Sequence, residues 1–246
     1  MNIRLLIEYD GSAYCGWQRQ ANGLTIQEVI EECLAKIHGR RTVIYGASRT
    51  DSGVHARGQV ACFDTDSDLA PHRWEQVLNY HLPRDIRVRE SREAAADFHP
   101  QKKCTGKEYE YVVLNRSMAS ALDARAYFVP SRIDWGRVRE ALPQFVGTHD
   151  FKAFQGAKAT VQSTVRTVTR FDLFEKGDGF YALRVTGNGF LKQMVRTMAG
   201  TLVEIGLGKR DIGDVERIIR SLDRTQAGHT APAAGLMLVR ISYEGE

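Results

Sequence analysis

Cysteine and long apolar runs are scarce in this 246-residue sequence, and each scarcity excludes a class of protein. The four cysteines form no Cys-x-x-Cys pair and match no set of histidines; they are Cys15, Cys33, Cys62 and Cys104. This spacing argues against a zinc site and against a redox motif. No uninterrupted apolar run approaches the length of a membrane span, so we expect no membrane segment, reduced thiols and a cytoplasmic location.

The sequence also lacks a strong excess of charge of either sign. It has 34 basic and 30 acidic side chains, which give a net charge of +4. The basic side chains are mostly arginine, whose planar guanidinium group suits phosphates and stacks on bases. This bias favours a nucleic-acid partner, although a GC-rich genome would produce the same bias.

The hydrophobic periodicity predicts strands and helices that follow one another without a flexible linker. Strands are expected at 3–9, 59–63, 86–88, 107–114, 165–174, 180–186 and 235–243. Helices are expected from a capping box at Thr25 and Glu28, from Pro71, from Asp134 with a break at Pro143, over 190–205 and over 213–222.

This order of elements predicts an α+β fold built from two similar α/β-sandwich halves. The first half is expected at 1–103 and the second at 104–246. Hairpins outnumber regular βαβ crossovers, so the sheet should be largely antiparallel. Because no linker separates the halves, we expect them to share one continuous sheet with a central cleft.

The segment from Ala47 to Val60 contains one carboxylate, Asp51, in a turn marked by glycine between two apolar runs. An aspartate in such a turn often bonds only its own backbone. Arg49 and Arg57 flank this carboxylate, however, and a turn alone does not need them. Nearby cations keep a carboxylate ionised near neutral pH and attract an anionic substrate. The segment is therefore a candidate site for a polyanion with Asp51 at its centre.

Two further residues suggest a site, although each also has a purely structural interpretation. Tyr109 lies in an expected strand, where tyrosine usually packs, but beside an acid it would be able to stack on an extruded base. Arg196 lies just off the apolar stripe of an expected helix, one turn after Lys192. A solvated helix face explains such a pair, whereas a guanidinium close to buried positions needs an anionic partner, for which Asp51 is the candidate.

Six sequence strings, in order and over nearly the whole chain, resemble the TruA-type tRNA pseudouridine synthases. They are Tyr-Asp-Gly-x-x-Tyr-x-Gly-Trp-Gln (Tyr9–Gln18), Arg-Thr-Asp (Arg49–Asp51), Lys-x-Tyr-x-Tyr (Lys107–Tyr111), Val-Arg-Thr (Val165–Thr167), Phe-Leu-x-x-Met-Val-Arg (Phe190–Arg196) and Thr-Ala-Pro-Ala (Thr230–Ala233). One such string would arise by chance, whereas six in order indicate membership of the family.

The resemblance implies an enzyme that isomerises uridine to pseudouridine at positions 38, 39 and 40 of the tRNA anticodon stem-loop, as a homodimer. It implies that Asp51 is catalytic, that Tyr109 stacks on the target uracil and that Arg196 pairs with Asp51. Arg49 would help to displace or replace the flipped base. The reaction exchanges a C1′–N1 bond for a C1′–C5 bond without net redox change, so we expect neither a cofactor nor a metal.

Two positions depart from the family pattern. Pro100 and Gln101 stand where the family usually has alanine and arginine, and His229 stands where proline is common. Both departures bear on the RNA footprint, and neither touches the three central residues.

Two other functional classes explain part of the sequence. A nucleoside hydrolase usually brings a second carboxylate or a metal set close to the first, and the central segment offers neither. A non-catalytic RNA-binding module would explain the arginines but would not need Asp51, which repels phosphate. The Gly206–Arg210 segment lacks the spacing and the Ser/Thr of a phosphate loop, which excludes an NTPase.

Overall fold

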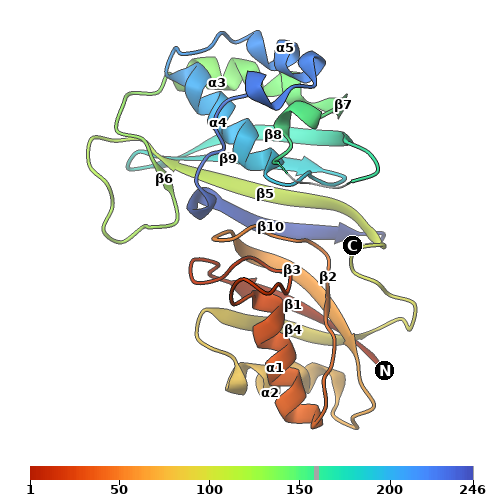
Figure 1. Ribbon diagram of the computed structural model, residues 1–246. Coiled ribbons are helices and arrows are strands. Elements are labelled where there is room, and N and C mark those ends of the chain that lie inside the picture. The colour runs from red at the N-terminus through yellow and green to blue at the C-terminus, as the bar shows by residue number, and fades with distance from the viewer. Residues whose placement is uncertain (158–160, 246) are drawn as a thin grey trace. The chain divides into compact units, whose positions relative to one another are not determined.

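The computed structural model describes residues 1–157 and 161–245, and the chain forms two compact units (Figure 1). The N-terminal unit comprises Met1–Thr105 together with Met237–Glu246, and the C-terminal unit comprises Gly106–Leu236. The sequence-based division at residue 104 treats both halves as contiguous. In the structure, the last strand of the chain returns to the N-terminal unit.

The N-terminal unit is a sheet with two helices on one face (Figure 1). Its strands are β1 (Asn2–Tyr9), β2 (Tyr45–Gly46), β3 (His55–Asp64), β4 (Ile86–Ala94) and β10 (Leu236–Tyr243). Their order is β4–β1–β3–β10, with β2 paired to β3. All these pairs are antiparallel except that of β10 with β3. The helices are α1 (Ile26–His38) and α2 (Trp74–His81), the latter after a 3₁₀ turn at Pro71–Arg73.

The capping box predicted from Thr25 and Glu28 is confirmed at the start of α1. The Thr25 hydroxyl accepts a hydrogen bond from the Glu28 backbone N–H at 3.3 Å. The helix ends at Gly39, whose φ of 68° a residue with a side chain rarely adopts. Below the helices, alternate residues of β1 are fully buried, and the Phe63 ring of β3 packs edge-on to Trp74 at 5.0 Å.

The C-terminal unit repeats the plan, and its long strands are antiparallel. Its strands are β5 (Cys104–Leu114), β6 (Tyr127–Phe128), β7 (Gly147–Asp150), β8 (Val165–Gly177) and β9 (Phe180–Gly187). The order is β5–β9–β8–β7, and the short β6 runs parallel to β5. The helices are α3 (Trp135–Ala141), α4 (Met194–Gly206) and α5 (Asp214–Ser221). Four 3₁₀ turns lie at Leu142–Phe145, Lys152–Phe154, Arg224–Gln226 and Ala233–Gly235.

Most element boundaries follow the predicted pattern, with one correction. The predicted helix break at Pro143 is confirmed, because α3 ends at Ala141 and a 3₁₀ turn follows. The predicted helix over 190–205 is wrong at its start, since α4 begins at Met194. Gln193 before it has a φ of 60°, in the left-handed region, which no α-helix passes through. Phe190 therefore lies outside the helix, in the segment that precedes it, and Arg196 lies in the first turn of α4.

The α+β class, with two α/β halves and largely antiparallel pairing, is confirmed. Across 1–157 and 161–245, none of the helices combines the length and the apolar character that a membrane crossing requires.

Candidate active site

Asp51 lies in the loop that joins β2 to β3, within the N-terminal unit. The residues on either side of Arg49, Ser48 and Thr50, are buried, whereas Arg49 itself is exposed and Asp51 is half-buried. The loop thus presents a cation and a carboxylate at its surface while its backbone is embedded in the unit. This arrangement brings two of the four predicted site residues together.

The Tyr9–Gln18 segment, the first string shared with the family, holds this loop in place. The Thr50 carbonyl accepts a hydrogen bond from the Trp17 N–H at 3.1 Å, and the Thr50 hydroxyl bonds the Tyr9 hydroxyl at 2.7 Å. On the other side of Asp51, the Gly53 N–H donates to the Tyr14 carbonyl at 3.2 Å. Two strings that are far apart in the sequence therefore form one structure.

Glycines allow the two segments to approach at backbone distance. Gly16 has a φ of 86°, and a Cβ atom there would lie 2.5 Å from the Thr50 carbonyl oxygen. A Cβ on Gly11 would lie 2.0 Å from the Val54 carbonyl oxygen. No side chain fits in either place, so these glycines are required by contact with the Asp51 loop rather than by a turn alone.

The base of the loop is closed by buried side-chain amide and imidazole groups. The Gln59 amide donates to the Ser48 carbonyl at 2.6 Å and accepts from the Ser48 N–H at 3.1 Å. His55 Nδ1 accepts from the Gly11 N–H at 3.1 Å. These bonds satisfy backbone groups that would otherwise be buried without a partner, and they fix the backbone on both sides of Asp51.

Tyr109 lies on β5 in the C-terminal unit, opposite Val185 of β9. Its side chain is 7% exposed, and its ring meets the Phe190 ring edge-on with centroids 5.4 Å apart. The packing role expected of a strand tyrosine is therefore met. Phe190 opens another shared string, so that string lies against Tyr109 within this unit.

Arg196 is the third residue of α4 and binds the segment that precedes β10. Its Nε donates to the Ala231 carbonyl at 2.8 Å, and the Ala231 N–H donates back to the Arg196 carbonyl at 3.1 Å. The Tyr111 hydroxyl donates to the next carbonyl, that of Pro232, at 2.8 Å. Burial raises the pKa of Tyr111, and the nearby Arg196 charge opposes that rise. Three shared strings of this unit, Lys107–Tyr111, Phe190–Arg196 and Thr230–Ala233, thus meet at this segment.

The His229 departure strengthens the anchoring of that segment. Glu204 of α4 accepts hydrogen bonds from the His229 backbone N–H at 2.9 Å and from its ring Nδ1 at 2.7 Å. Burial opposes ionisation of Glu204, but bonds from Arg210 and His229 lower its pKa to about 2. A proline at 229 would have no N–H to donate. The histidine therefore ties the Arg196-binding segment to α4 through two bonds.

The second departure lies in the N-terminal unit, beside β10. The Pro100 carbonyl accepts a hydrogen bond from the buried Tyr243 hydroxyl at 3.0 Å, whereas Gln101 is exposed. This segment is anchored through its backbone, so the loss of the usual arginine changes surface charge and leaves the anchor intact.

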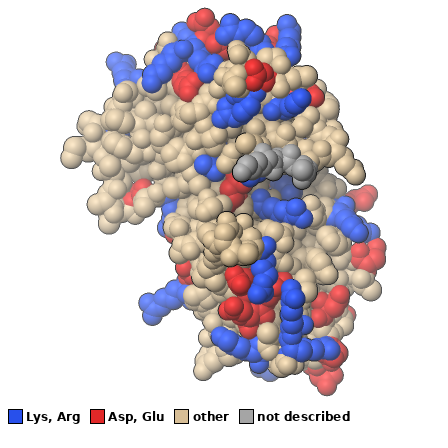
Figure 2. All heavy atoms as spheres, viewed as in Figure 1, with Lys and Arg blue, Asp and Glu red and all other residues tan. Residues whose placement is uncertain are grey.

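The charged surface over α1 differs from a nucleic-acid site. Figure 2 shows acidic and basic side chains side by side there. Arg19 pairs with Glu28 at 3.3 Å and with Glu31 at 3.1 Å, so its charge is neutralised locally. Within the described residues, no group of three or more His, Cys, Asp or Glu side chains is placed to hold a metal ion.

Sequence reasoning missed two sets of residues. The first is the glycine frame, Gly11 and Gly16, whose role depends on contacts with the distant Asp51 loop. The second is the gathering of arginines from β1, β3, β4 and β10 around a hollow in the N-terminal unit. The alternation of arginine with Ile86 and Val88 was a signal for the second set. No local sequence signal marks the two glycines.

The sequence of the chain matches one protein family along most of its length. The sequence model described as tRNA pseudouridine synthase matches residues 5–101 and 141–244. A relative named tRNA pseudouridine synthase A from Geobacter sp. (strain M21) is 45% identical over 98% of both chains. One of the same name from Acetivibrio thermocellus is 44% identical over 98% of this chain and 99% of the relative.

Among solved structures, "Crystal structure of the archaeal box H/ACA sRNP Nop10-Cbf5 complex" aligns at 11% identity with a TM-score of 0.40. The alignment covers 98% of this chain and 49% of that one. A likeness of this size adds nothing to the assignment.

The α+β fold and the interlocked strings, together with these relatives, define an RNA-modifying isomerase. The chain belongs to the tRNA pseudouridine synthase family, and it converts uridine to pseudouridine in tRNA.

Proposed function

We propose that this enzyme modifies uridines 38, 39 and 40 of the anticodon stem-loop, that Asp51 is its catalytic residue and that it works as a cytoplasmic homodimer. The observation that supports Asp51 is the frame built around its loop. The Gly16 approach and the Tyr9–Thr50 bond hold a half-buried carboxylate beside the exposed Arg49. The near full-length similarity to relatives named tRNA pseudouridine synthase A supports the choice of substrate.

The reaction requires the target base to leave the helical stack before it rotates. The C1′–N1 bond breaks, the uracil turns, a C1′–C5 bond forms, and the proton on C5 leaves. Asp51 acts at the sugar, either as the nucleophile on C1′ or as the base that starts glycosidic cleavage. Both routes need an ionised carboxylate held in a fixed position, which the frame of the loop provides.

Tyr109 takes two roles in this proposal. Its ring stacks on the uracil, and its oxygen, as the phenolate, accepts the C5 proton after the new bond has formed. Arg49, exposed next to the buried Thr50, fills the space that the flipped base leaves in the RNA. The pairing of Arg196 with Asp51 joins residues of different units and stays a prediction of the family resemblance.

The Arg196 pairing is tested by the pH dependence of the rate. In Arg196→Ala, loss of a cation beside Asp51 raises the carboxyl pKa, so the acid limb of the kcat profile should move to higher pH. Arg196→Lys keeps the charge and should restore the limb, although it loses the planar bond to Ala231. An acid limb that stays in place in Arg196→Ala would show that the two residues are not partners.

The function itself is tested with tRNA labelled with tritium at uridine C5. Tritium should be released without added cofactor or metal, and pseudouridine should appear at positions 38, 39 or 40. Label retained at these positions and released elsewhere would reject the anticodon stem-loop. Free uracil in place of pseudouridine would indicate a hydrolase.

A further inference from the structure

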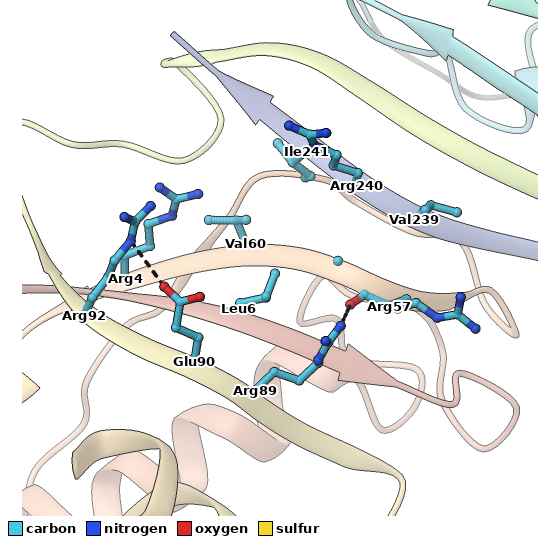
Figure 3. Close-up of a pocket in the computed structure, with 11 residues that line it drawn as sticks. Arg4, Leu6, Arg57, Val60, Arg89, Glu90, Arg92, Val239, Arg240 and Ile241 are labelled. Atoms are coloured by element: carbon cyan, nitrogen blue, oxygen red, sulfur yellow. Dashed lines mark hydrogen bonds and ion pairs between the residues drawn. The ribbon is translucent and has the colours of Figure 1, made fainter. Parts of the chain in front are cut away.

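A hollow of about 360 Å³ lies on the sheet of the N-terminal unit, away from the Asp51 loop (Figure 3). Strand register shows which face it occupies. Ile3 pairs with Phe63, which packs on Trp74 of α2, so the next residue, Arg4, points to the opposite face. The hollow is therefore open on the side of the sheet that α1 and α2 do not cover.

Five arginines and one acid supply the charge of this hollow. They are Arg4, Arg57, Arg89, Arg92, Arg240 and Glu90. The lining thus carries an excess of four positive charges, equal to the net charge of the entire chain, which is +4. A concentration of like charge around a concave surface is unfavourable unless an anion enters it.

The arrangement of the strands places like charges directly opposite each other. Arg4 of β1 and Arg92 of β4 are register partners, a pairing that destabilises a sheet. Arg92 contacts Glu90 at 3.5 Å, and Arg4 lies over the Tyr243 ring at 4.6 Å. Arg4 also lies over the Phe98 ring at 5.4 Å, so aromatic faces and a carboxylate surround this pair of cations.

A β-bulge adds a third guanidinium group to the site. The register of β4 against β1 shifts between Leu6 and Ile7, where Glu90 and Val88 are their partners, and Arg89 is the extra residue. Arg89 Nη1 donates to the Arg57 carbonyl at 3.4 Å and contacts Glu8 at 3.6 Å. The irregular strand thus directs Arg89 towards β3 at the rim of the hollow.

The other two arginines of the hollow, Arg57 and Arg240, differ from these three. In the part of the chain that the structure describes, the guanidinium groups of Arg57 and Arg240 make no hydrogen bond and no ion pair, and both residues are exposed. Their donors are available to a ligand. A guanidinium group binds phosphate with two parallel hydrogen bonds, which makes phosphate the anion that best fits this site.

The shape of the hollow indicates a chain of phosphates rather than a single one. In Figure 3, Arg4 and Arg92 lie at one end and Arg57 and Arg89 at the other, with Leu6 and Val60 between them. Two cationic ends separated by an apolar floor match a nucleic-acid backbone, in which phosphates alternate with sugars and bases. Arg57 follows Asp51 by six residues, so it lies within about 20 Å of the loop.

We propose that this hollow, the β1–β4 arginine pocket, binds the phosphodiester backbone of the RNA substrate at nucleotides beyond the one that is modified. The proposal rests on the proposed function of the Asp51 loop, because it assigns the pocket to the same RNA. The pocket positions the RNA and takes no part in the chemistry. A free nucleotide carries the same phosphate chemistry, and a second copy of the chain is the other occupant to test.

The experiment compares the double variant Arg57→Gln/Arg240→Gln with the wild-type enzyme. These two arginines are chosen because their removal leaves no carboxylate without a partner. The matched control is Arg217→Gln/Arg220→Gln on α5, which removes the same charge from side chains that are 71% and 80% exposed. Affinity for unmodified tRNA is measured from about 50 to 300 mM salt, the melting temperature checks folding, and sedimentation gives the oligomeric state.

The pocket variant should bind tRNA about 10- to 100-fold more weakly at low salt. The slope of log affinity against log salt should fall by about 1–2, since each lost phosphate contact removes roughly one from it. Its KM should rise, whereas the control should stay within about twofold of wild type. Uridine 5′-monophosphate, the free-nucleotide probe, should not bind measurably below about 1 mM.

Three results would overturn the proposal. An unchanged salt slope, in a variant that still makes pseudouridine, rejects the pocket and leaves the proposed function intact. Micromolar binding of uridine 5′-monophosphate that the double variant loses, with an unchanged slope for tRNA, assigns the pocket to a free nucleotide. A change in sedimentation without a change in slope assigns it to a second copy of the chain.

Discussion

The two units hold their proposed functional side chains by different means. In the N-terminal unit, Asp51 lies in a loop whose order comes from a second segment, through backbone bonds at Thr50 and the close approach of Gly16. In the C-terminal unit, Tyr109 and Arg196 lie on a strand and a helix. A loop has no repeating hydrogen bonds, so its geometry depends on irregular contacts with other segments. A helix bonds its own backbone, and a strand is held by the regular ladder to the strands beside it.

A buried acid of the C-terminal unit and the arginine pocket of the N-terminal unit show two different arrangements of charge. In the C-terminal unit, burial of Glu110 would raise its pKa, but hydrogen bonds from Lys176 at 2.6 Å and Arg184 at 2.8 Å hold the pKa below its usual range. In the N-terminal unit, the arginines of the pocket outnumber the acid there. The cations at Glu110 neutralise a buried acid, whereas those of the pocket are in excess over the acid beside them.

The largest expected effect tests whether the loop carries the chemistry. Asp51→Asn keeps the shape of the side chain but loses its charge and basicity, so turnover should fall by at least about 10²–10⁴-fold, while tRNA affinity stays nearly unchanged. Single-turnover kinetics and a binding titration measure the two quantities separately. A variant with a tenth of the wild-type rate would remove Asp51 from the centre of the mechanism.

A smaller effect tests whether the loop depends on its frame. Gly16→Ala places a Cβ against the Thr50 carbonyl at a φ of 86°, and should lower the free energy of unfolding by about 2–4 kcal/mol and slow turnover. Gly39→Ala is the matched control, because its φ is also positive, at 68°, but its surroundings are open. Gly39→Ala should lower the free energy of unfolding by about 1–2 kcal/mol and leave turnover unchanged. Equal effects on turnover would mean that the approach of Gly16 to the loop has no functional role.

Substitutions of Tyr109 test whether a residue on a regular strand has a chemical role in addition to packing. Tyr109→Phe keeps the ring and its contact with Phe190, so it should bind tRNA normally but turn over at least about tenfold more slowly. Tyr109→Ala should in addition lose about 1–3 kcal/mol of base stacking. Normal turnover by the phenylalanine variant would leave stacking as the only role and assign the C5 proton to water.

The smallest effect concerns the segment that binds Arg196. The pKa of Glu204 is about 2 in the folded chain, below the ordinary value of 4.5. The ionised carboxylate therefore stabilises the folded chain above about pH 4.5, and this stabilisation is lost as the pH falls towards 2. Urea unfolding should find Glu204→Gln less stable than wild type by about 1–2 kcal/mol at pH 7. This difference in the free energy of unfolding between wild type and variant should be smaller at pH 3. An equal difference in stability at pH 7 and pH 3 would show that the charge of Glu204 does not anchor His229.

Local sequence patterns were sufficient for much of the fold because they report local physics. The capping box at Thr25, the break at Pro143 and the alternation along β1 each depend on residues a few positions apart. The start of α4 was missed for the converse reason. The apolar stripe continues through Phe190, and only the left-handed backbone of Gln193, set by the surrounding structure, ends the helix there.

The sequence by itself determined the class of reaction and named Asp51, Arg49, Tyr109 and Arg196 as candidates, because side-chain chemistry and ordered strings are read directly from the chain. Only the tertiary structure decided what holds them. Gly16 meets the Asp51 loop, the segment containing Ala231 meets α4, and arginines from four strands meet in one pocket, through contacts between residues far apart in the sequence. Such contacts leave no periodic signal, since packing, and not local backbone preference, creates them.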